Sequence, residues 1–594
     1  MNFFKILKSN TNLLIINRKR TTLIKMSQDK LDGAGLIAKS LKEQGVEYMF
    51  GVVGIPVIEI ALRAQQYGIK YIGMRNEQSA SYAASAIGYM TRKPAVSLCV
   101  SGPGFVHTLA GMANSNENSW PLLVIGGSSE TAQEGQGAFQ EFPQVTIAKN
   151  FSKYSARPSS LSQIPFFIEK AIRISTFGRP GSVYLDFPAE MITSTIEQDE
   201  ISKTSLCPEA PRPLTSLQNL DQICDLIKNS QRPLIIIGKG AAYSQAEMEI
   251  NELVKKLRVP FLPTPMGKGV VDDDHEFCVS AARSTALKEA DLIILLGARL
   301  NWMLHFGQSP RFSSNVKFIQ VDINAEELGT NSFNSMQIQA DLKAFTKQLN
   351  EFIKDKSLDD KKEWWDLLNK KVEKNKNVIL SMANDTTLPL NYYAAYSQIK
   401  SVVPEDYILV SEGANTMDTS RSILNHSEPR HRLDAGSFGT MGVGSGFAIA
   451  AALYCRDYHP NKKVICIQGD SAFGFGGMEI ETAYRYSLPI ILVIFNNNGI
   501  YGGLDVENFN ELKKSGDPAL CLPPMSLTSG IRYEKLALAF ENFKGYFCQT
   551  PDDIRKAFES ALKETQTPSI INIEINPSAD RKAQEFPWLT KSKI

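Results

Sequence analysis

A series of short runs of leucine and β-branched residues is the feature of this sequence that most restricts its fold. Each run stops at Gly, Asp, Asn or Ser and is followed by a stretch with helical spacing. Examples are PLLVIGGSS, PLIIIGKGA, DLIILLGAR, KFIQVDIN, YILVSEGAN, KVICIQGD and PIILVIFNNNG. Strands that are apolar throughout and alternate with helices are typical of parallel sheets covered on both faces. We therefore predict an α/β fold of doubly wound parallel sheets, with ligands bound outside the carboxyl ends of the strands.

The chain has 594 residues, which is too long for one hydrophobic core and predicts several domains. Two polar segments mark the boundaries. A proline-bearing stretch at 195–213 is typical of a linker without strands, and a charged, solvated helical segment precedes Pro389. We predict three doubly wound domains at 28–195, 212–350 and 388–575, with an extension at 1–27 and a tail at 576–594.

Charge and cysteine content exclude several classes of protein. Lys and Arg number 64 against 63 for Asp and Glu, so no net field attracts nucleic acid or an anionic membrane. The eight cysteines are scattered, without a C-x-x-C motif, which disfavours a zinc site or a disulfide framework. The apolar runs of the first 26 residues are too short to span a bilayer. We expect neither a nucleic-acid partner nor a membrane span.

The two ends of the chain carry conflicting targeting signals. The first 26 residues hold six basic and no acidic residues, which fits a mitochondrial transit peptide, a disordered extension or an upstream start before Met26. Ser592-Lys593-Ile594 resembles the S-K-L peroxisomal signal with Ile for Leu. We predict a peroxisomal location, with a mitochondrial one as the alternative.

Polar residues follow two apolar runs in the last predicted domain. Asp470 comes after VICIQG, and Asn497 comes after IILVIFN with Gly499 two positions later. If these strands are adjacent and parallel, a carboxylate, an amide oxygen and a backbone carbonyl meet at one sheet edge, and such an all-oxygen set suits Mg²⁺. Alternatively, Asp470 caps a helix and the asparagines form a turn. The paired strand ends and the glycine-rich stretch after Asp470 favour a site for a diphosphate and its metal.

The pattern G-D-S, a spacer and N-N-x-G resembles the diphosphate and metal motif of the thiamine diphosphate enzymes. The resemblance extends from about residue 28 to the C-terminus and implies a thiamine diphosphate-binding fold, with a pyrimidine-binding first domain and a diphosphate-binding last domain. It implies thiamine diphosphate and Mg²⁺ as cofactors, contacted by Asp470, Ser471, Asn497, Gly499 and Ile500. Because family members build each site from two subunits, it also implies a homodimer or homotetramer.

Two further segments fit this family. Glu77 heads an alanine-rich helix in MRNEQSASYAASAIGYM. The matching glutamate of the family hydrogen-bonds the aminopyrimidine N1′ and promotes ylide formation at thiazolium C2, so that the cofactor performs the difficult chemistry. A first-turn glutamate that stabilises the helix dipole is the alternative. GSFGTMGVGSGFA resembles the segment that holds the cofactor bent, with Gly439, Thr440 and Met441 at the pyrimidine; a glycine-rich turn with a core methionine is the alternative.

The central domain combines glycine with a charged residue at several strand ends or turns, in IIIGKGA, PMGKG, LLGARLNW and QVDIN. Lys239, Lys268 and Arg299 could bind phosphates, and Asp322 could accept a hydrogen bond from a ribose hydroxyl. Solvated turns are the alternative for each residue, and a flavin site is a second one. The domain resembles most closely that of the acyl-CoA-acting branch, where it binds an ADP moiety, so ADP is a candidate effector.

Within that branch the chain resembles the 2-hydroxyacyl-CoA lyases, in segments such as RNEQSASYAASAIGYM, GAFQEFPQV and FNNNGIYGG. Oxalyl-CoA decarboxylase is the alternative. Asn76 stands where the decarboxylase has a histidine, and Phe139-Gln140 stands where it has Tyr-Glu, which favours a neutral 2-hydroxyl and an alkyl chain. The resemblance implies cleavage of a 2-hydroxyacyl-CoA to formyl-CoA and an aldehyde one carbon shorter, the chemistry of fatty acid α-oxidation.

Tyr501 and Gln140 are the candidates for positioning the substrate hydroxyl or relaying its proton, although both could equally be packing residues. In the tail, Arg581 or Lys591 could contact CoA phosphates. A noncatalytic regulatory subunit with the same fold is a further alternative. Loss of Glu77 or Asp470 would be its signature, and both residues are present.

Overall fold

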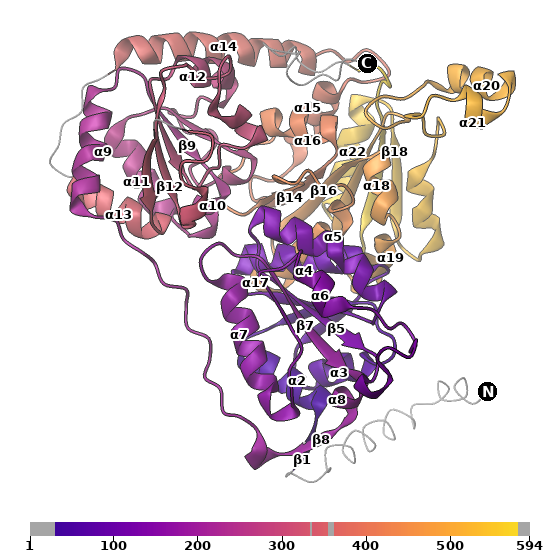
Figure 1. Ribbon diagram of the computed structural model, residues 1–594. Helices are drawn as coiled ribbons and strands as arrows, with labels where there is room; N and C mark the ends of the chain where they lie inside the picture. Colours follow the sequence, from indigo (N-terminus) through magenta and orange to yellow (C-terminus); the bar gives the residue numbers. More distant parts are fainter. Residues whose placement is uncertain (1–29, 333–334, 354–360, 580–594) are drawn as a thin grey trace.

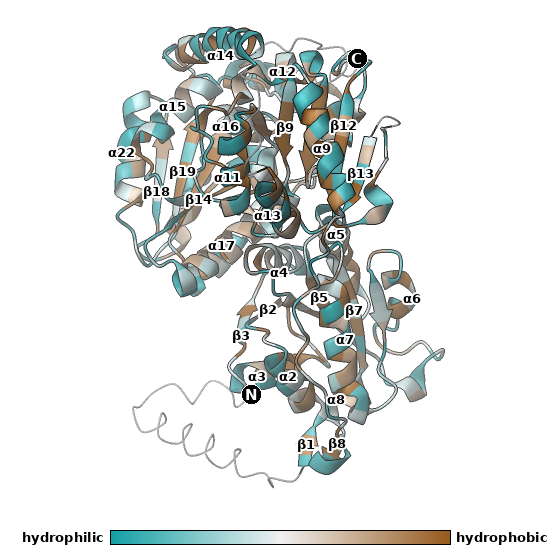
Figure 2. Ribbon diagram, turned by 90° about the vertical axis from the view of Figure 1, so that its left-hand side faces the viewer, coloured by the Kyte–Doolittle hydropathy of each residue, from teal (hydrophilic) through white to brown (hydrophobic). Residues whose placement is uncertain are grey.

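The computed structural model describes residues 30–332, 335–353 and 361–579. Three parallel sheets, each flanked by helices, form three domains along the chain (Figure 1). The apolar strands lie between helices whose outer faces are more hydrophilic (Figure 2). This arrangement confirms the predicted α/β class with three doubly wound parallel sheets. Among the described residues, no helix has both the length and the apolar composition needed to cross a bilayer.

The first domain has a six-stranded sheet in the order β3-β2-β4-β5-β7-β6. Its strands are β2 (Tyr48–Gly51), β3 (Lys70–Gly73), β4 (Ala95–Cys99), β5 (Leu122–Ser128), β6 (Tyr154–Ala156) and β7 (Ser182–Pro188). Its helices are α2 (Gly33–Glu43), α3 (Ile58–Gln66), α4 (Glu77–Thr91), α5 (Pro103–Asn118), α6 (Gln144–Ala148), α7 (Ile164–Thr176) and α8 (Ala189–Thr193). The central strands β4, β5 and β7 are buried along their whole length, as the apolar runs predict.

The stretch 195–213 differs from the prediction of a linker without strands. Its first residues form β8 (Thr195–Glu197), which pairs antiparallel with β1 (Lys30–Asp32) and places Ile196 opposite Leu31. Ile196 is 7% exposed and belongs to the core of the first domain. One buried isoleucine between polar neighbours therefore extends that core, and residues 202–216 then run to the central domain without helix or strand.

The central domain has a five-stranded sheet in the order β10-β9-β11-β12-β13. Its strands are β9 (Pro233–Ile237), β10 (Phe261–Pro263), β11 (Leu292–Leu296), β12 (Lys317–Asp322) and β13 (Ser335–Gln339). Its helices are α9 (Leu217–Asn229), α10 (Lys239–Tyr243), α11 (Glu247–Leu257), α12 (Arg283–Glu289) and α13 (Leu342–Phe352). The charged segment before Pro389 contains the long helix α14 (Lys362–Ala383), in which Trp364 and Leu368 are buried.

The last domain has a six-stranded sheet in the order β15-β14-β16-β17-β19-β18. Its strands are β14 (Tyr407–Glu412), β15 (Arg432–Asp434), β16 (Lys463–Gly469), β17 (Ile490–Asn496), β18 (Lys544–Cys548) and β19 (Ser569–Glu574). Its helices are α15 (Tyr392–Val402), α16 (Ala414–Ile423), α17 (Gly444–Tyr458), α18 (Asp470–Gly476), α19 (Glu479–Arg485), α20 (Val506–Ser515), α21 (Pro518–Cys521) and α22 (Pro551–Ala561). In Figure 1, α20 and α21 project away from the sheet.

The first and last domains pack together through α4 and α17 (Figure 1). Small residues permit this approach, since a Cβ on Gly446 would lie 2.7 Å from the backbone oxygen of Ser79. Phe447 of α17 packs between aromatic side chains of the first domain, with its ring centroid 5.2 Å from that of Trp120 and 6.3 Å from that of Tyr82. One hydrophobic core therefore spans both domains.

Candidate active site

The carboxyl ends of β16 and β17 bring Asp470 and the asparagine turn together. The two strands are adjacent and parallel, with Gly469 opposite Phe495. Asp470 is the first residue of α18, so it follows the capping residue Gly469 rather than being the cap itself. Its Oδ2 accepts a hydrogen bond from the N–H of Gly499 at 3.1 Å, and its Oδ1 accepts one from the N–H of Ser471 at 2.8 Å. We call Asp470, Asn497 and Gly499 the second half-site.

The second half-site has the chemistry of a site for a hard cation. Asp470 is 2% and Asn497 4% exposed. Asn497 donates its amide N–H to the backbone oxygen of Tyr501 at 3.2 Å, and this leaves its amide oxygen as the atom that can bind a metal. Burial raises the pKa of Asp470 to about 7, and among the described residues no lysine or arginine lowers it. A buried carboxylate with this cost is stabilised by a divalent cation, so the residues fit Mg²⁺.

A glycine-rich turn lies between β15 and α17 and contains Gly439, Thr440 and Met441. Gly439 has a φ of 69°, a region that favours glycine, and a Cβ there would have no neighbour within 4 Å, so its backbone faces open space. Thr440 donates its hydroxyl to Asn114 of α5 at 2.8 Å, and Met441 is half-buried. The turn of the last domain is thereby attached to a helix of the first.

Glu412, at the end of β14, holds the far side of this turn and was not among the predicted site residues. Its carboxylate accepts hydrogen bonds from the N–H of Gly442, from the N–H of Gly444 at 2.7 Å and from the side chain of Gln468 at 2.7 Å. Burial raises the pKa of Glu412 to about 7, against the opposing effect of these donors. The sequence signal was present, because Glu412 ends an apolar strand just as Asp470 follows one.

Glu77 is the first residue of α4, and Asn76 is the cap of that helix. The Asn76 side chain accepts a hydrogen bond from the N–H of Gln78 at 2.7 Å, so it caps the N-terminus of the helix rather than pairing with Glu77. The Glu77 Oε2 lies 3.0 Å from Nδ1 of His107 on α5. His107 was not predicted, because it lies inside a helical stretch 30 positions from its partner and no local pattern marks it. We call Glu77 and His107, with Gln140, the first half-site.

Gln140 and Tyr501 occupy loops with the same unusual backbone conformation. Their φ angles are 56° and 70°, a left-handed region that side-chain-bearing residues seldom adopt. Gln140 lies beside Gly102, where an added Cβ would be 2.8 Å from the Gln140 backbone oxygen. Tyr501 is 58% exposed, and its backbone oxygen accepts from both Asn415 and Asn497. Ile500 beside it is 52% exposed. Strained backbone of this kind is frequent at functional sites.

Lys239, Arg299 and Asp322 line one cavity between the first and central domains. Burial, reinforced by the positive charge of Arg299, lowers the pKa of Lys239 well below its ordinary value. Burial also raises the pKa of Asp322, whose carboxylate lies 3.8 Å from Arg179. The cavity wall includes the stacked rings of Tyr89 and Trp120, with centroids 4.9 Å apart, and also Tyr243. Cationic, acidic and aromatic groups thus meet in one place.

Lys268 does not join this cavity. Its ammonium forms a 2.6 Å ion pair with Asp273, and both side chains are almost fully buried, with exposures of 6% and 2%. Asp273 also accepts from the N–H of His426 at 2.9 Å, so the pair attaches the central domain to the last. This environment does not fit the phosphate-binding role predicted from PMGKG, because the lysine charge is already neutralised within the protein.

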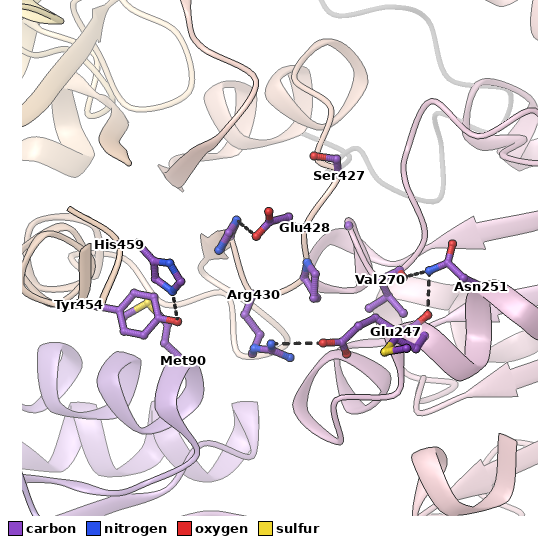
Figure 3. Close-up of a pocket in the computed structure, with 13 residues that line it drawn as sticks. Met90, Glu247, Asn251, Val270, Ser427, Glu428, Arg430, Tyr454 and His459 are labelled. Atoms are coloured by element: carbon purple, nitrogen blue, oxygen red, sulfur yellow. Dashed lines mark hydrogen bonds and ion pairs between the residues drawn. The ribbon is translucent and has the colours of Figure 1, made fainter. Parts of the chain in front are cut away.

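A second cavity lies where the three domains meet (Figure 3). Arg430 lies 3.5 Å from Glu247 of α11, and Tyr454 lies 3.1 Å from the Nε2 of His459. Asn251 donates to the backbone oxygen of Val270 at 2.8 Å on the opposite wall. None of the predicted site residues lines it, so this cavity is separate from both half-sites. Several predictions concern residues outside the described ranges. These are the CoA contacts of Arg581 and Lys591, the Ser592-Lys593-Ile594 signal and the basic N-terminal extension.

Three family descriptions match successive parts of the chain. They are "Thiamine pyrophosphate enzyme, N-terminal TPP binding domain" at 31–147, "Thiamine pyrophosphate enzyme, central domain" at 220–349 and "Thiamine pyrophosphate enzyme, C-terminal TPP binding domain" at 412–573. Glu77 lies in the first match, Lys239, Arg299 and Asp322 in the second, and the second half-site in the third.

The chain is also similar to curated proteins over nearly its full length. It is 53% identical to human "2-hydroxyacyl-CoA lyase 1", over 96% of this chain and 98% of the relative. It is 42% identical to "2-hydroxyacyl-CoA lyase" of Arabidopsis thaliana, over 92% and 96%. It is 39% identical to "Oxalyl-CoA decarboxylase" of Escherichia coli K12, over 95% and 98%. The chain therefore belongs to the thiamine pyrophosphate enzymes and, within them, to the 2-hydroxyacyl-CoA lyase family.

Proposed function

We propose that this protein is a thiamine diphosphate-dependent carbon–carbon lyase that cleaves a 2-hydroxyacyl-CoA to formyl-CoA and an aldehyde one carbon shorter. The observation that carries the proposal is the 53% identity to human 2-hydroxyacyl-CoA lyase 1, against 39% to the oxalyl-CoA decarboxylase of E. coli. The amide of Gln140 and the capping role of Asn76 agree with it, because neither side chain can carry a charge. A neutral hydroxyacyl substrate suits such a site.

Two groups of residues would hold the cofactor. Asp470, Asn497 and the backbone oxygen of Gly499 would bind Mg²⁺ and, through it, the diphosphate. Gly439 and Met441 would contact the pyrimidine, while Glu77 would hold its ring nitrogen. When bound, thiamine diphosphate supplies the electron sink that cleavage of the bond between C1 and C2 requires. Tyr501 and Gln140 would orient the substrate hydroxyl, whose proton must leave as the aldehyde forms.

We propose further that the working form is a homodimer, or a tetramer of dimers. Glu77 forms its hydrogen bond within the first domain, and Asp470 forms its hydrogen bonds within the last domain. Each half-site therefore supplies only one part of a cofactor site, and the other part would come from the second copy of the chain. Apolar side chains next to both half-sites are exposed, and a second copy of the chain would cover them. They are Val106 at 41%, Phe139 at 76%, Phe475 at 59%, Met478 at 57% and Ile500 at 52%.

The cavity around Lys239 supports ADP as an effector. The cationic side chains of Lys239, Arg299 and Arg179 suit a diphosphate, and Asp322 suits a ribose hydroxyl. The aromatic wall of Tyr89, Trp120 and Tyr243 suits an adenine ring. Lys239 is the strongest support, since a buried lysine with a depressed pKa is stabilised when an anion binds beside it.

The deciding experiment is mass spectrometry of the products after incubation with thiamine diphosphate, Mg²⁺ and either a long-chain 2-hydroxyacyl-CoA or oxalyl-CoA. Formyl-CoA and a shortened aldehyde from the first substrate would support the lyase. Formyl-CoA and CO₂ from oxalyl-CoA alone would identify a decarboxylase instead. Glu77→Gln is the negative control, because it keeps the shape of the side chain but cannot exchange a proton. If the protein converted neither substrate, a noncatalytic role would be favoured.

A further inference from the structure

The contact between Glu77 and His107 is the feature of the first half-site that the proposed function leaves without a role. The Glu77 Oε2 and the His107 Nδ1 are 3.0 Å apart, which is hydrogen-bond distance. The Glu77 side chain is 13% exposed and the His107 side chain 55%. Among the described residues, His107 is the one ion-pair partner of Glu77. This contact is therefore the candidate for holding the Glu77 carboxylate in one orientation.

Helix packing fixes the two residues at this separation. Both α4 and α5 follow parallel strands and pack side by side. Ser81 lies one turn after Glu77, and Gly111 lies one turn after His107. A Cβ on Gly111 would be 1.9 Å from the Ser81 hydroxyl, so only glycine permits this approach. The close contact one turn further along both helices thus brings Glu77 and His107 within reach of each other.

The start of α5 is anchored independently. Pro103 occupies the first turn, and the N–H of Gly102 donates to the Oε1 of Gln144 at 2.8 Å. Gln144 is itself buried and donates to the backbone oxygen of Gly127 and to Asp186. The backbone that carries His107 is therefore held by the core of the first domain, whether or not a ligand is present.

The two oxygens of Glu77 have different surroundings. His107 contacts Oε2, whereas Oε1 lies near Gly104, where an added Cβ would be 3.4 Å from it. One oxygen is engaged within the protein, and the other forms no hydrogen bond among the described residues.

We propose that His107 is a positioning residue for Glu77. Its Nδ1–H donates to Oε2 and holds the carboxylate so that Oε1 faces the pyrimidine of the cofactor. This proposal rests on the assignment of thiamine diphosphate to the site, but not on the identity of the acyl-CoA. The proposed positioning of Glu77 requires only a hydrogen-bond donor at the place of the His107 Nδ1. The amide nitrogen of an asparagine at position 107 would provide a similar donor.

The test compares His107→Ala, His107→Phe and His107→Asn with the wild-type enzyme, all loaded with thiamine diphosphate and Mg²⁺. The first readout is hydrogen–deuterium exchange at C2 of the bound cofactor, followed by NMR after an acid quench. The second is the near-ultraviolet circular dichroism of the bound pyrimidine. We expect Ala and Phe to slow the exchange roughly 10- to 100-fold, the scale of a small misplacement, and to alter the dichroism. Asn should restore both.

Calorimetric titration of the cofactor separates positioning from loss of fold. The second half-site, away from His107, would hold the Mg²⁺ that binds the diphosphate, so the cofactor affinity of the three variants should stay close to that of the wild type. Wild-type exchange in the Ala variant, or an Asn variant as slow as Ala, would overturn the proposal. Because the exchange needs no acyl-CoA, failure of the lyase assay alone would contradict the proposed reaction and leave this result standing. His275→Asn, in the central domain, is the matched control.

Discussion

The carboxylate of Glu412 accepts a hydrogen bond from the backbone N–H of Gly444 at 2.7 Å and thereby ties the end of β14 to the turn that carries Met441. Glu412 is fully buried, and burial raises its pKa to about 7. An unfolded glutamate titrates near about 4.3. Between pH values of about 4.3 and about 7, Glu412 therefore keeps its proton in the folded state but has lost it in the unfolded state.

This relationship predicts a pH dependence of stability with a definite sign. Because the carboxyl pKa is higher in the folded state, its contribution to the free energy of unfolding is fully present below about pH 4.3. This contribution is lost as the pH rises through about 7. Glu412→Gln cannot titrate. Between pH 5 and 8, denaturant melts should show the wild type losing on the order of 3 kcal/mol relative to the variant. The exposed residue Glu405, replaced by Gln, is the control. A difference that does not change with pH would mean that Glu412 keeps an ordinary pKa.

Asp470→Asn should separate two effects of a buried charge. Without metal, the variant should be at least as stable as the wild type, because it removes a carboxylate whose burial is unfavourable. With Mg²⁺, its affinity for thiamine diphosphate should fall at least about 10-fold, the lower range for loss of even an indirect metal partner. Thermal melts and calorimetry measure the two effects, and exposed Asp552→Asn is the control. Unchanged affinity would remove Asp470 from the metal site.

The sheet and the second half-site were predictable because they follow from local rules. Buried parallel strands are apolar along their whole length, and polar residues after them lie at one edge. The 3.1 Å distance between the Oδ2 of Asp470 and the backbone nitrogen of Gly499 follows from that rule. Glu412 obeys it too, since YILVSEG ends in the same way as VICIQGD. It lies outside the diphosphate and metal motif, which begins at Gly469.

The remaining features depend on contacts that no local pattern encodes. His107 becomes significant only because Gly111 allows α5 to approach α4. Lys268 has the same glycine-flanked pattern as Lys239, yet one pairs with Asp273 in the interior and the other lines a cavity. The nearby acidic run at 272–274 was the available signal. β8 was missed because a single buried isoleucine, Ile196, decides it.

The depressed pKa of Lys239 predicts opposite effects on stability and on ligand binding. Lys239→Met should raise the melting temperature of the ADP-free protein, because it removes a buried cation close to Arg299. The same change should weaken ADP binding at least about 10-fold, the cost of losing one charge-assisted contact of roughly 1.5 kcal/mol or more. Calorimetry with ADP and thermal melts without it are the measurements. The exposed Lys255→Met on α11 should alter neither. An undiminished ADP affinity would place the nucleotide elsewhere.

Tyr501 and Gln140 can be told apart by removing one hydroxyl. Tyr501→Phe keeps the ring and the backbone at a φ of 70°, so the fold and the cofactor affinity should not change. If the hydroxyl relays the substrate proton, kcat should fall about 100-fold with little change in KM, the pattern expected when an interaction exists only in the transition state. Steady-state kinetics on a 2-hydroxyacyl-CoA measure this. A normal kcat would assign Tyr501 to packing, and the same loss in Gln140→Ala would then transfer the role to Gln140.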